Sequence, residues 1–153
     1  MDLIKIEENV FEIPSFLSVD ECDALINLSE DIGFKEADVQ TPSGRELLTH
    51  IRNNERVDYH SNDLAQSYWQ RLVNLNLPAF EGKSAIGLSP YFRFYRYLPG
   101  QKFSLHKDGR QNVHGNETLF TFLIYLNEDC VGGETFFRQG SLRVSPKKGT
   151  AIL

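Results

Sequence analysis

The spacing of the apolar side chains changes at Tyr91, and this change constrains the fold more than any other feature. Before Tyr91, apolar residues recur every three to four positions, as they do on one face of a helix. From Tyr91 onward they alternate with polar residues, as they do in strands, and most of the 11 Phe and 6 Tyr lie in this second part. Helices followed by many short strands predict an α+β chain.

The first part of the chain predicts two helices, each with a single apolar face. Ser18 and Glu21 form a capping box, after which apolar residues recur at helical spacing up to Gly33, a favourable helix end. Ser61 caps a second helix that runs to Leu75. Because only one face of each helix is apolar, we expect both helices to pack on one sheet.

Short strands are predicted on both sides of these helices. They are Val10–Ile13, Leu47–Ile51, Tyr91–Tyr97, Phe103–His106, Thr118–Leu126, Glu134–Phe137, Leu142–Val144 and Thr150–Leu153. The polar run Asp108–Glu117 is expected to form a loop. The predicted architecture is a double-stranded β-helix, or jelly roll, with two N-terminal helices packed on one sheet. We expect a single domain over residues 1–153, with residues 1–90 as helical support and residues 91–153 as an incomplete β-helix core.

The dense polar run Arg52-Asn53-Asn54-Glu55-Arg56 has two interpretations. Such runs are common on protein surfaces, which favours a solvated loop. Alternatively, the run lies at the mouth of a site and binds an anionic or amide-bearing substrate.

Charge, apolar runs and cysteine content narrow the class of protein. The net charge of -5 argues against general nucleic-acid binding. No apolar run approaches the roughly 20 residues of a membrane span, and no signal peptide is evident. Cys22 and Cys130 lie far apart and suit a reducing compartment. We therefore expect a cytoplasmic protein that binds neither nucleic acid nor membranes.

His106 and Asp108 form the candidate metal site. In an extended chain, side chains two positions apart point to the same face, so this imidazole and this carboxylate converge while Lys107 points away. Both groups can bind one metal ion at roughly 2.0–2.2 Å. Iron(II) oxygenases use two His and one carboxylate on one side of their metal. A lone His-x-Asp motif arises often by chance, so its surroundings decide its meaning.

Those surroundings resemble a known family over residues 90–153. Four ordered blocks carry the resemblance: Tyr97-x2-Gly100-Gln101-x4-His106-x-Asp108, Thr121 to Asn127, Gly132-Gly133-Glu134-Thr135-x-Phe137, and Val144-x-Pro146-x2-Gly149-Thr150. Together they are similar to the Fe(II)- and 2-oxoglutarate-dependent dioxygenases of the prolyl 4-hydroxylase-like type. Several blocks in the right order are far more specific than a single His-x-Asp motif.

The resemblance implies an activity and a role for six residues. It implies hydroxylation of an unactivated C–H bond, in a protein side chain such as proline or in a small metabolite, with succinate and CO2 as coproducts. It implies Fe(II), 2-oxoglutarate and O2, with ascorbate as a further candidate. The implied iron ligands and catalytic residues are His106 and Asp108, and the implied 2-oxoglutarate pocket comprises Tyr97, Thr121, Leu123 and Tyr125.

Strand parity supports part of this assignment. Arg93, Tyr95 and Tyr97 share one face of their predicted strand, opposite two Phe side chains, so they fit a wall between a wet pocket and an apolar core. Arg93 and Tyr95 on this wall, with Arg110 in the following loop, are the candidate substrate contacts. The residues alone equally allow Tyr97 and Tyr125 to be core side chains with hydroxyls at the rim.

The family pattern continues with a second His and a basic 2-oxoglutarate anchor beyond the strand that ends at Leu153. We therefore expect a shortened version of a longer chain, which is itself poorly active, and whose open sheet edges favour dimers. A catalytically inactive jelly-roll binding module is the alternative. A cupin-like metal barrel is less favoured, because it predicts a tighter cluster of more histidines.

Overall fold

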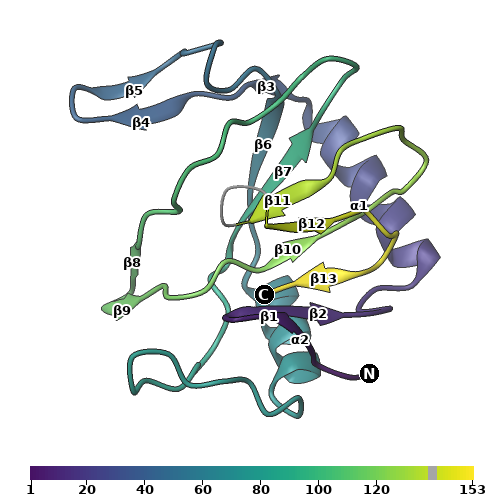
Figure 1. Ribbon diagram of the computed structural model, residues 1–153, viewed down its shortest axis with the longest axis vertical. Coiled ribbons are helices and arrows are strands. Elements are labelled where there is room, and N and C mark those ends of the chain that lie inside the picture. Colours follow the sequence, from purple (N-terminus) through teal and green to yellow (C-terminus); the bar gives the residue numbers. More distant parts are fainter. Residues whose placement is uncertain (138–140) are drawn as a thin grey trace.

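The computed structural model describes residues 1–137 and 141–153 as two helices and a set of short strands (Figure 1). In chain order these are β1 (Ile4–Glu7), β2 (Val10–Ile13), α1 (Val19–Ile32), β3 (Lys35–Glu36), β4 (Val39–Thr41), β5 (Gly44–Glu46), β6 (Glu55–His60), α2 (Asn62–Leu72), β7 (Tyr91–Arg96), β8 (Asn112–Val113), β9 (Asn116–Glu117), β10 (Leu123–Ile124), β11 (Thr135–Phe137), β12 (Leu142–Val144) and β13 (Ala151–Ile152). Within the described ranges, no helix has the length and apolar character that crossing a bilayer requires.

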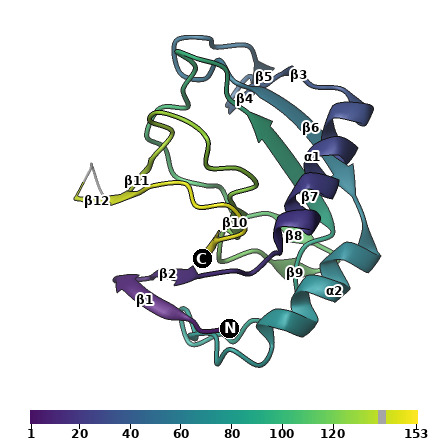
Figure 2. The same cartoon turned by 90° about the vertical axis from the view of Figure 1, so that its right-hand side faces the viewer.

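Two sheets and three hairpins organise the strands. One sheet has the order β1-β2-β13-β10 and the other the order β3-β6-β7, and both are antiparallel. The pairs β4–β5, β8–β9 and β11–β12 form the hairpins. Figure 2 shows α1 and α2 on the β6–β7 side of the molecule, with the β1-β2-β13-β10 sheet across from them.

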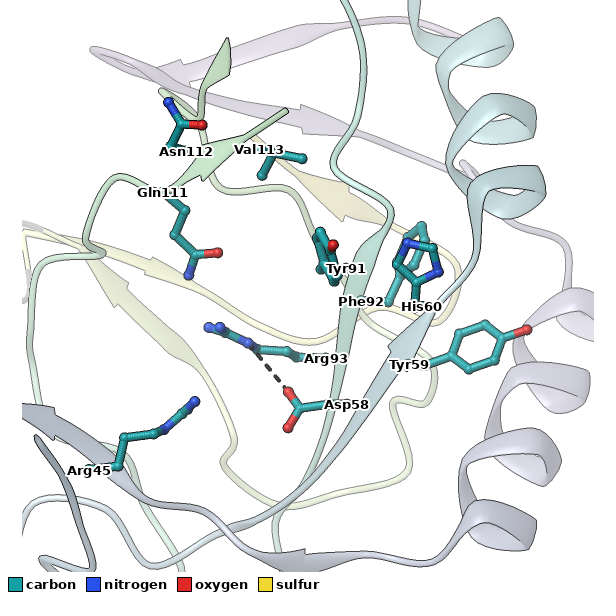
Figure 3. Close-up of a pocket in the computed structure, with 10 residues that line it drawn as sticks. All are labelled: Arg45, Asp58, Tyr59, His60, Tyr91, Phe92, Arg93, Gln111, Asn112 and Val113. Atoms are coloured by element: carbon teal, nitrogen blue, oxygen red, sulfur yellow. Dashed lines mark ion pairs between the residues drawn. The ribbon is translucent and has the colours of Figure 1, made fainter. Parts of the chain in front are cut away.

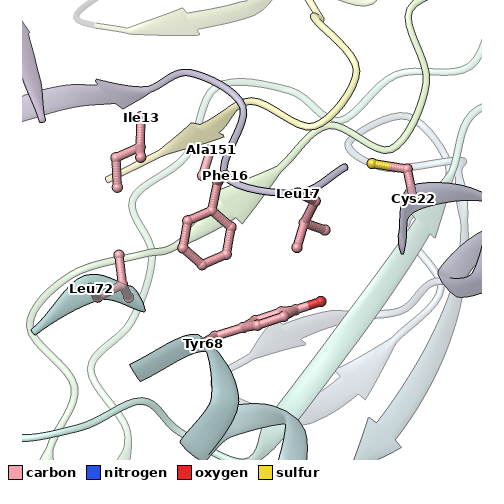
Figure 4. Close-up of a cluster of buried hydrophobic side chains, with 7 residues drawn as sticks. All are labelled: Ile13, Phe16, Leu17, Cys22, Tyr68, Leu72 and Ala151. Carbon is pink, nitrogen blue, oxygen red and sulfur yellow. The ribbon is translucent and has the colours of Figure 1, made fainter. Parts of the chain in front are cut away.

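The main hydrophobic core joins α2 to the sheet that holds both ends of the chain. Its buried members are Ile13, Phe16, Leu17, Cys22, Tyr68, Leu72 and Ala151. Figure 4 shows the Phe16 ring between the strand residues above it and the α2 residues below it. The ring meets Tyr68 edge-on at 5.3 Å and Phe122 edge-on at 5.0 Å between centroids, a favourable arrangement for aromatic rings.

The predicted starts of both helices are confirmed. Ser18 Oγ accepts the Glu21 N–H while Glu21 Oε2 accepts the Ser18 N–H, which completes the predicted capping box of α1. Ser61 Oγ accepts the Leu64 N–H at the start of α2. The second helix ends at Leu72 instead of Leu75, because the Leu75 N–H closes a tight turn onto the Leu72 carbonyl.

Alternation of side chains is confirmed even where the predicted strand is too long. Thr118–Leu126 was expected to be one strand, but only Leu123–Ile124 pairs, with β13. The alternation nevertheless extends beyond the paired residues: Phe122, Ile124 and Leu126 pack on the main core, whereas Leu123 and Tyr125 pack on a second cluster around Val10, Val144 and Ile152. The residue pattern therefore predicts the faces correctly, while the reach of the partner strand determines how many residues pair.

Three other expectations about regular structure are wrong. Phe103–His106 is not a strand, because Phe103 makes only a single bridge, to Arg52. Leu47–Ile51 is not a strand, because the Ile51 N–H turns back onto the Leu48 carbonyl. The expected loop Asp108–Glu117 contains the β8–β9 hairpin.

Candidate active site

The imidazole of His106 and the carboxylate of Asp108 lie together, as their spacing predicts. His106 Nε2 is 3.2 Å from Asp108 Oδ1. The two side chains meet although the segment that carries them is not a regular strand. A spacing of two residues is enough to bring the two side chains within 3.2 Å without a strand.

Each member of the pair is held by a second partner. His106 Nδ1 lies 2.7 Å from the Ser104 carbonyl oxygen, which can only accept, so Nδ1 carries a proton, while Nε2 faces the carboxylate and donates to it when the ring is an imidazolium. The Thr121 hydroxyl donates to Asp108 Oδ2 at 2.5 Å, which leaves Oδ1 toward His106. Outer hydrogen bonds of this kind orient the ligands of a metal and keep them in one tautomer.

The hydrogen bond between the two groups shifts both pKa values toward an ion pair. The His106 bond lowers the pKa of Asp108, against the effect of burial, and the Thr121 bond lowers it further. The same bond from Asp108 raises the pKa of His106, again against burial. Asp108 is therefore ionised near neutral pH, the state in which a carboxylate binds a metal.

The polar run Arg52–Arg56 is not the solvated loop that surface statistics favour. Arg52 is 5% exposed and Asn54 is 1% exposed. Asn54 Oδ1 accepts the Arg52 Nε–H at 2.7 Å, and Asn53 Oδ1 accepts the Lys102 N–H at 2.7 Å. The run thus contacts the segment that carries His106. The polar composition of the run does not predict this long-range contact.

The predicted 2-oxoglutarate residues lie at different depths. Tyr125 is half-buried and its hydroxyl donates to Thr135 Oγ1 at 2.7 Å, while Leu123 packs on the second cluster. Tyr97 is 47% exposed. Partial burial raises the pKa of both tyrosines, so both hydroxyls stay protonated and can donate hydrogen bonds. Of these four residues, Thr121 contacts the His106–Asp108 pair, through its bond to Asp108.

A surface hollow of about 450 Å³ lies over the face of β6 and β7 that is turned away from the helices (Figure 3). Its lining residues are Arg45, Asp58, Tyr59, His60, Tyr91, Phe92, Arg93, Gln111, Asn112 and Val113. Arg93 Nε is 3.5 Å from Asp58 Oδ1, across the β6–β7 register. Figure 3 shows Arg93 and Gln111 reaching into the hollow while Tyr59 points away. The charge of Arg93 is also the smallest of the influences that lower the pKa of Asp108.

The three candidate substrate residues have different surroundings. Arg93 lines the hollow, as its predicted face requires. The Tyr95 ring instead lies against the buried Arg52 guanidinium, whose carbon is 4.4 Å from the ring centre. Arg110 pairs with Glu81 and Glu117 and is exposed.

Sequence reasoning missed the residues that support His106. Phe103 stacks on the His106 ring with centroids 3.7 Å apart, and Ser104 binds its Nδ1. Their positions, three and two residues before His106, were the available signal. The contribution of Arg52 had no local signal, because it lies more than fifty residues away in sequence.

The two donor atoms of the pair are of the types that bind a ferrous ion. One imidazole nitrogen and one carboxylate oxygen are the donors that non-haem iron prefers. Two such ligands at about 2.1 Å and a right angle would lie about 3 Å apart, close to the observed separation. Among the residues described, no group of three or more His, Cys, Asp or Glu could hold a metal ion together.

Known proteins match this chain in sequence and in fold. A model of the 2OG-Fe(II) oxygenase superfamily matches residues 92–153. Prolyl 4-hydroxylase 1 of Arabidopsis thaliana is 25% identical over 182 residues, covering 99% of this chain and 59% of that protein. Probable prolyl 4-hydroxylase 3 of the same plant is 23% identical and covers 94% of this chain and 50% of that protein. The crystal structure of a viral collagen prolyl hydroxylase from Paramecium bursaria Chlorella virus-1, in complex with 2OG, superposes with a TM-score of 0.63, at 27% identity and over 94% of this chain and 76% of that one.

These agreements identify the chain as similar to the 2-oxoglutarate/Fe(II) oxygenases, with their jelly-roll fold. Within that class it resembles the prolyl 4-hydroxylases, as its motifs predict. The chain spans about half the length of the curated relatives it matches.

Proposed function

We propose that this protein is an Fe(II)- and 2-oxoglutarate-dependent oxygenase that hydroxylates an unactivated C–H bond in a polypeptide side chain, such as that of proline. The observation that carries the proposal is the 3.2 Å approach of His106 Nε2 to Asp108 Oδ1, inside the region that matches the oxygenase family. The prolyl hydroxylases among the similar proteins favour a peptide substrate.

His106 and Asp108 are the proposed iron ligands. When bound, Fe(II) with 2-oxoglutarate and O2 supplies the oxidising power that hydroxylates carbon and releases succinate and CO2. The protein residues bind and orient. Thr121 fixes the Asp108 carboxylate, and Ser104 keeps the proton of His106 on Nδ1.

The proposed 2-oxoglutarate pocket comprises Tyr97, Thr121, Leu123 and Tyr125. Tyr97 and Tyr125 can donate hydroxyl hydrogen bonds to carboxylate oxygens, and Leu123 supplies apolar wall. Since the Tyr125 hydroxyl already donates to Thr135, cosubstrate binding would exchange this partner for a carboxylate oxygen.

The hollow over β6 and β7 is the proposed substrate entrance. Most of its lining residues are exposed, including Arg45, Tyr91 and Gln111, so it can receive an extended chain whose ends remain in solvent. Arg93 links the hollow to Asp108 electrostatically. A peptide laid along this face would bring one side chain to the metal pair.

Four further predictions stand beside this function. We infer that residues 1–153 form one domain in which α1 and α2 support the jelly roll from one side. A cytoplasmic location, a use for ascorbate and a dimer through open sheet edges stay predictions.

An anaerobic titration tests the metal site. Fe(II) is added with 2-oxoglutarate, and the visible charge-transfer band of the chelated complex is recorded. We expect the band in the parent protein and its loss in His106→Ala. His114→Ala is the matched control, because His114 lies in the β8–β9 turn and keeps all contacts of the pair intact.

The outcomes separate an oxygenase from a binding module. A band that survives His106→Ala, or no band at all, contradicts the proposed metal site and leaves the inactive jelly-roll module as the interpretation. A band without succinate release in the presence of proline-containing peptides would retain the metal site and reject the peptide substrate.

A further inference from the structure

Arg52 is a buried cation with no carboxylate partner among the residues that the structure describes. It is 5% exposed. Its Nε donates to Asn54 Oδ1 at 2.7 Å, while its buried Nη2 has no hydrogen-bond partner within residues 1–137 and 141–153. Burying a guanidinium is costly unless other interactions replace water, so this position calls for a specific explanation.

Two aromatic rings take the place of water around the Arg52 guanidinium. The guanidinium carbon of Arg52 lies 4.4 Å from the centre of the Tyr95 ring and 4.2 Å from the centre of the Phe103 ring. A guanidinium is attracted to the face of an aromatic ring, and the attraction is strongest away from water. The Arg52 guanidinium is therefore held over two ring faces at once, a contact that the smaller ammonium group of a lysine reproduces poorly.

The same Phe103 ring also contacts His106. The two ring centres are 3.7 Å apart and their planes are 21° apart. A guanidinium and an imidazole that both lie about 4 Å from one ring centre cannot occupy the same face of that ring. The Arg52 guanidinium carbon thus lies over the Tyr95 and Phe103 rings, and the His106 ring, the candidate iron ligand, stacks on Phe103.

The backbone on either side of Arg52 forms hydrogen bonds with the segment that precedes His106. The Ile51 carbonyl accepts the Ser104 N–H at 2.8 Å, and the Asn53 N–H donates to the Lys102 carbonyl at 3.2 Å. Ser104 in turn binds His106 Nδ1. The segment that holds Arg52 therefore fixes both the ring and the carbonyl that define how His106 is oriented.

We propose that Arg52 is a positioning residue for His106, acting through the face of Phe103. In this role it touches neither metal nor substrate. It holds the Phe103 ring against the imidazole, so that Nε2 stays directed toward Asp108. The effect on metal binding rests on the proposed function, whereas the effect on the orientation of the imidazole does not.

The test uses Arg52→Lys, which keeps the positive charge and loses the planar group. Arg56→Lys is the matched control, because Arg56 is also largely buried, at 10% side-chain exposure, but pairs with Asp38 and Asp58. Two readouts are recorded on the full chain. The first is the ring-current shift of the His106 ring protons in the metal-free protein, with Phe103→Leu as the reference for complete loss. The second is the dissociation constant of Mn(II) alone, used as an air-stable stand-in for Fe(II).

We expect Arg52→Lys to move the His106 shifts toward those of Phe103→Leu and to raise the Mn(II) dissociation constant about tenfold. Arg52→Lys combined with Phe103→Leu should add little to either single change, because both act on one contact. Arg56→Lys should leave the His106 shifts within one line width of the parent values and the Mn(II) dissociation constant within twofold of the parent value. Tyr95→Leu, at an exposed ring, should act in the same direction and serves if Arg52→Lys does not fold.

Unchanged His106 shifts in a folded Arg52→Lys or Tyr95→Leu protein overturn the proposal, as does an effect equal to that of Arg56→Lys. If the parent protein binds no Mn(II), the proposed function fails, and the shifts of the metal-free protein still decide the role of Arg52.

Discussion

At the scale of single residues, hydrogen bonds to neighbouring groups orient both side chains of the candidate metal pair. Asp108 has one oxygen on Thr121 and the other toward His106, and His106 has one nitrogen on Ser104. These bonds leave His106 Nε2 and Asp108 Oδ1 facing each other. Preorganisation of this kind lowers the cost of binding a metal, because the ligands do not reorient.

Thr121→Val tests this arrangement at the residue scale. The substitution keeps the side-chain shape and removes the donor to Asp108 Oδ2, so the carboxylate gains rotational freedom. We expect about tenfold weaker Mn(II) binding, measured by electron paramagnetic resonance, with little change in thermal stability. Thr118→Val is the control, because Thr118 Oγ1 accepts the Gln111 N–H instead. Equal affinities in the two variants would remove Thr121 from the site.

At the scale of elements, the helices are joined by charge as well as by the core. Glu21 in the first turn of α1 bonds Arg71 near the end of α2, and Arg71 also donates to the Phe16 carbonyl at 2.8 Å. The Arg71 bond, followed by the bond from the Ser18 N–H, lowers the pKa of Glu21 from 4.5 to about 2. One carboxylate thus caps α1 and ties it to α2.

The pH dependence of stability follows from that shift. Since the folded pKa of Glu21 lies below its unfolded value, its contribution is complete above pH 4.5 and is lost as pH falls toward 2. Both side chains are about one-third exposed, and solvent screening limits the contribution to about 1 kcal/mol. Glu21→Gln should therefore be less stable than the parent at pH 7, and the difference should close by pH 2. Urea unfolding across this range checks it, and a constant difference would contradict the assignment.

At the scale of the whole molecule, the two ends of the chain form one sheet. β2 pairs with β13, so that Ile13 faces Ala151, and the Leu17 N–H donates to the Gly149 carbonyl at 3.0 Å. Gly149 also donates its N–H to the Tyr125 carbonyl at 2.8 Å. The segment before α1 is therefore attached directly to the strands that carry the predicted cosubstrate residues.

Gly149→Ala should break this attachment. A Cβ at position 149 would lie 2.2 Å from the Leu17 carbonyl oxygen, and φ is +79°. The left-handed backbone alone costs about 1–2 kcal/mol, and the clash with backbone adds to it, so we expect a loss of about 3 kcal/mol or more. Gly82→Ala is the control, with φ of +72° and no atom within 4 Å of the added Cβ. Chemical denaturation of both variants separates the clash from the backbone term, and equal losses would show that the close approach is unimportant.

Local patterns determine a large part of this protein. The capping box of α1, the Ser61 cap of α2 and the apolar spacing predict where the two helices begin, because caps and helical faces depend on residues within one or two turns. Alternation predicts which side chains of residues 91–96 and 122–126 face the core. The His106–Asp108 pair follows from a spacing of two residues, and the ordered motifs identify the family it resembles.

Tertiary structure decides what no local pattern contains. Strand lengths depend on the partner, so Thr118–Leu126 pairs only where β13 reaches it. The burial of Arg52 depends on two rings supplied by β7 and by the segment before His106, and a polar composition predicts the opposite. Side chains close in sequence are constrained by backbone geometry alone, whereas contacts across fifty residues arise only when the packed chain brings them together.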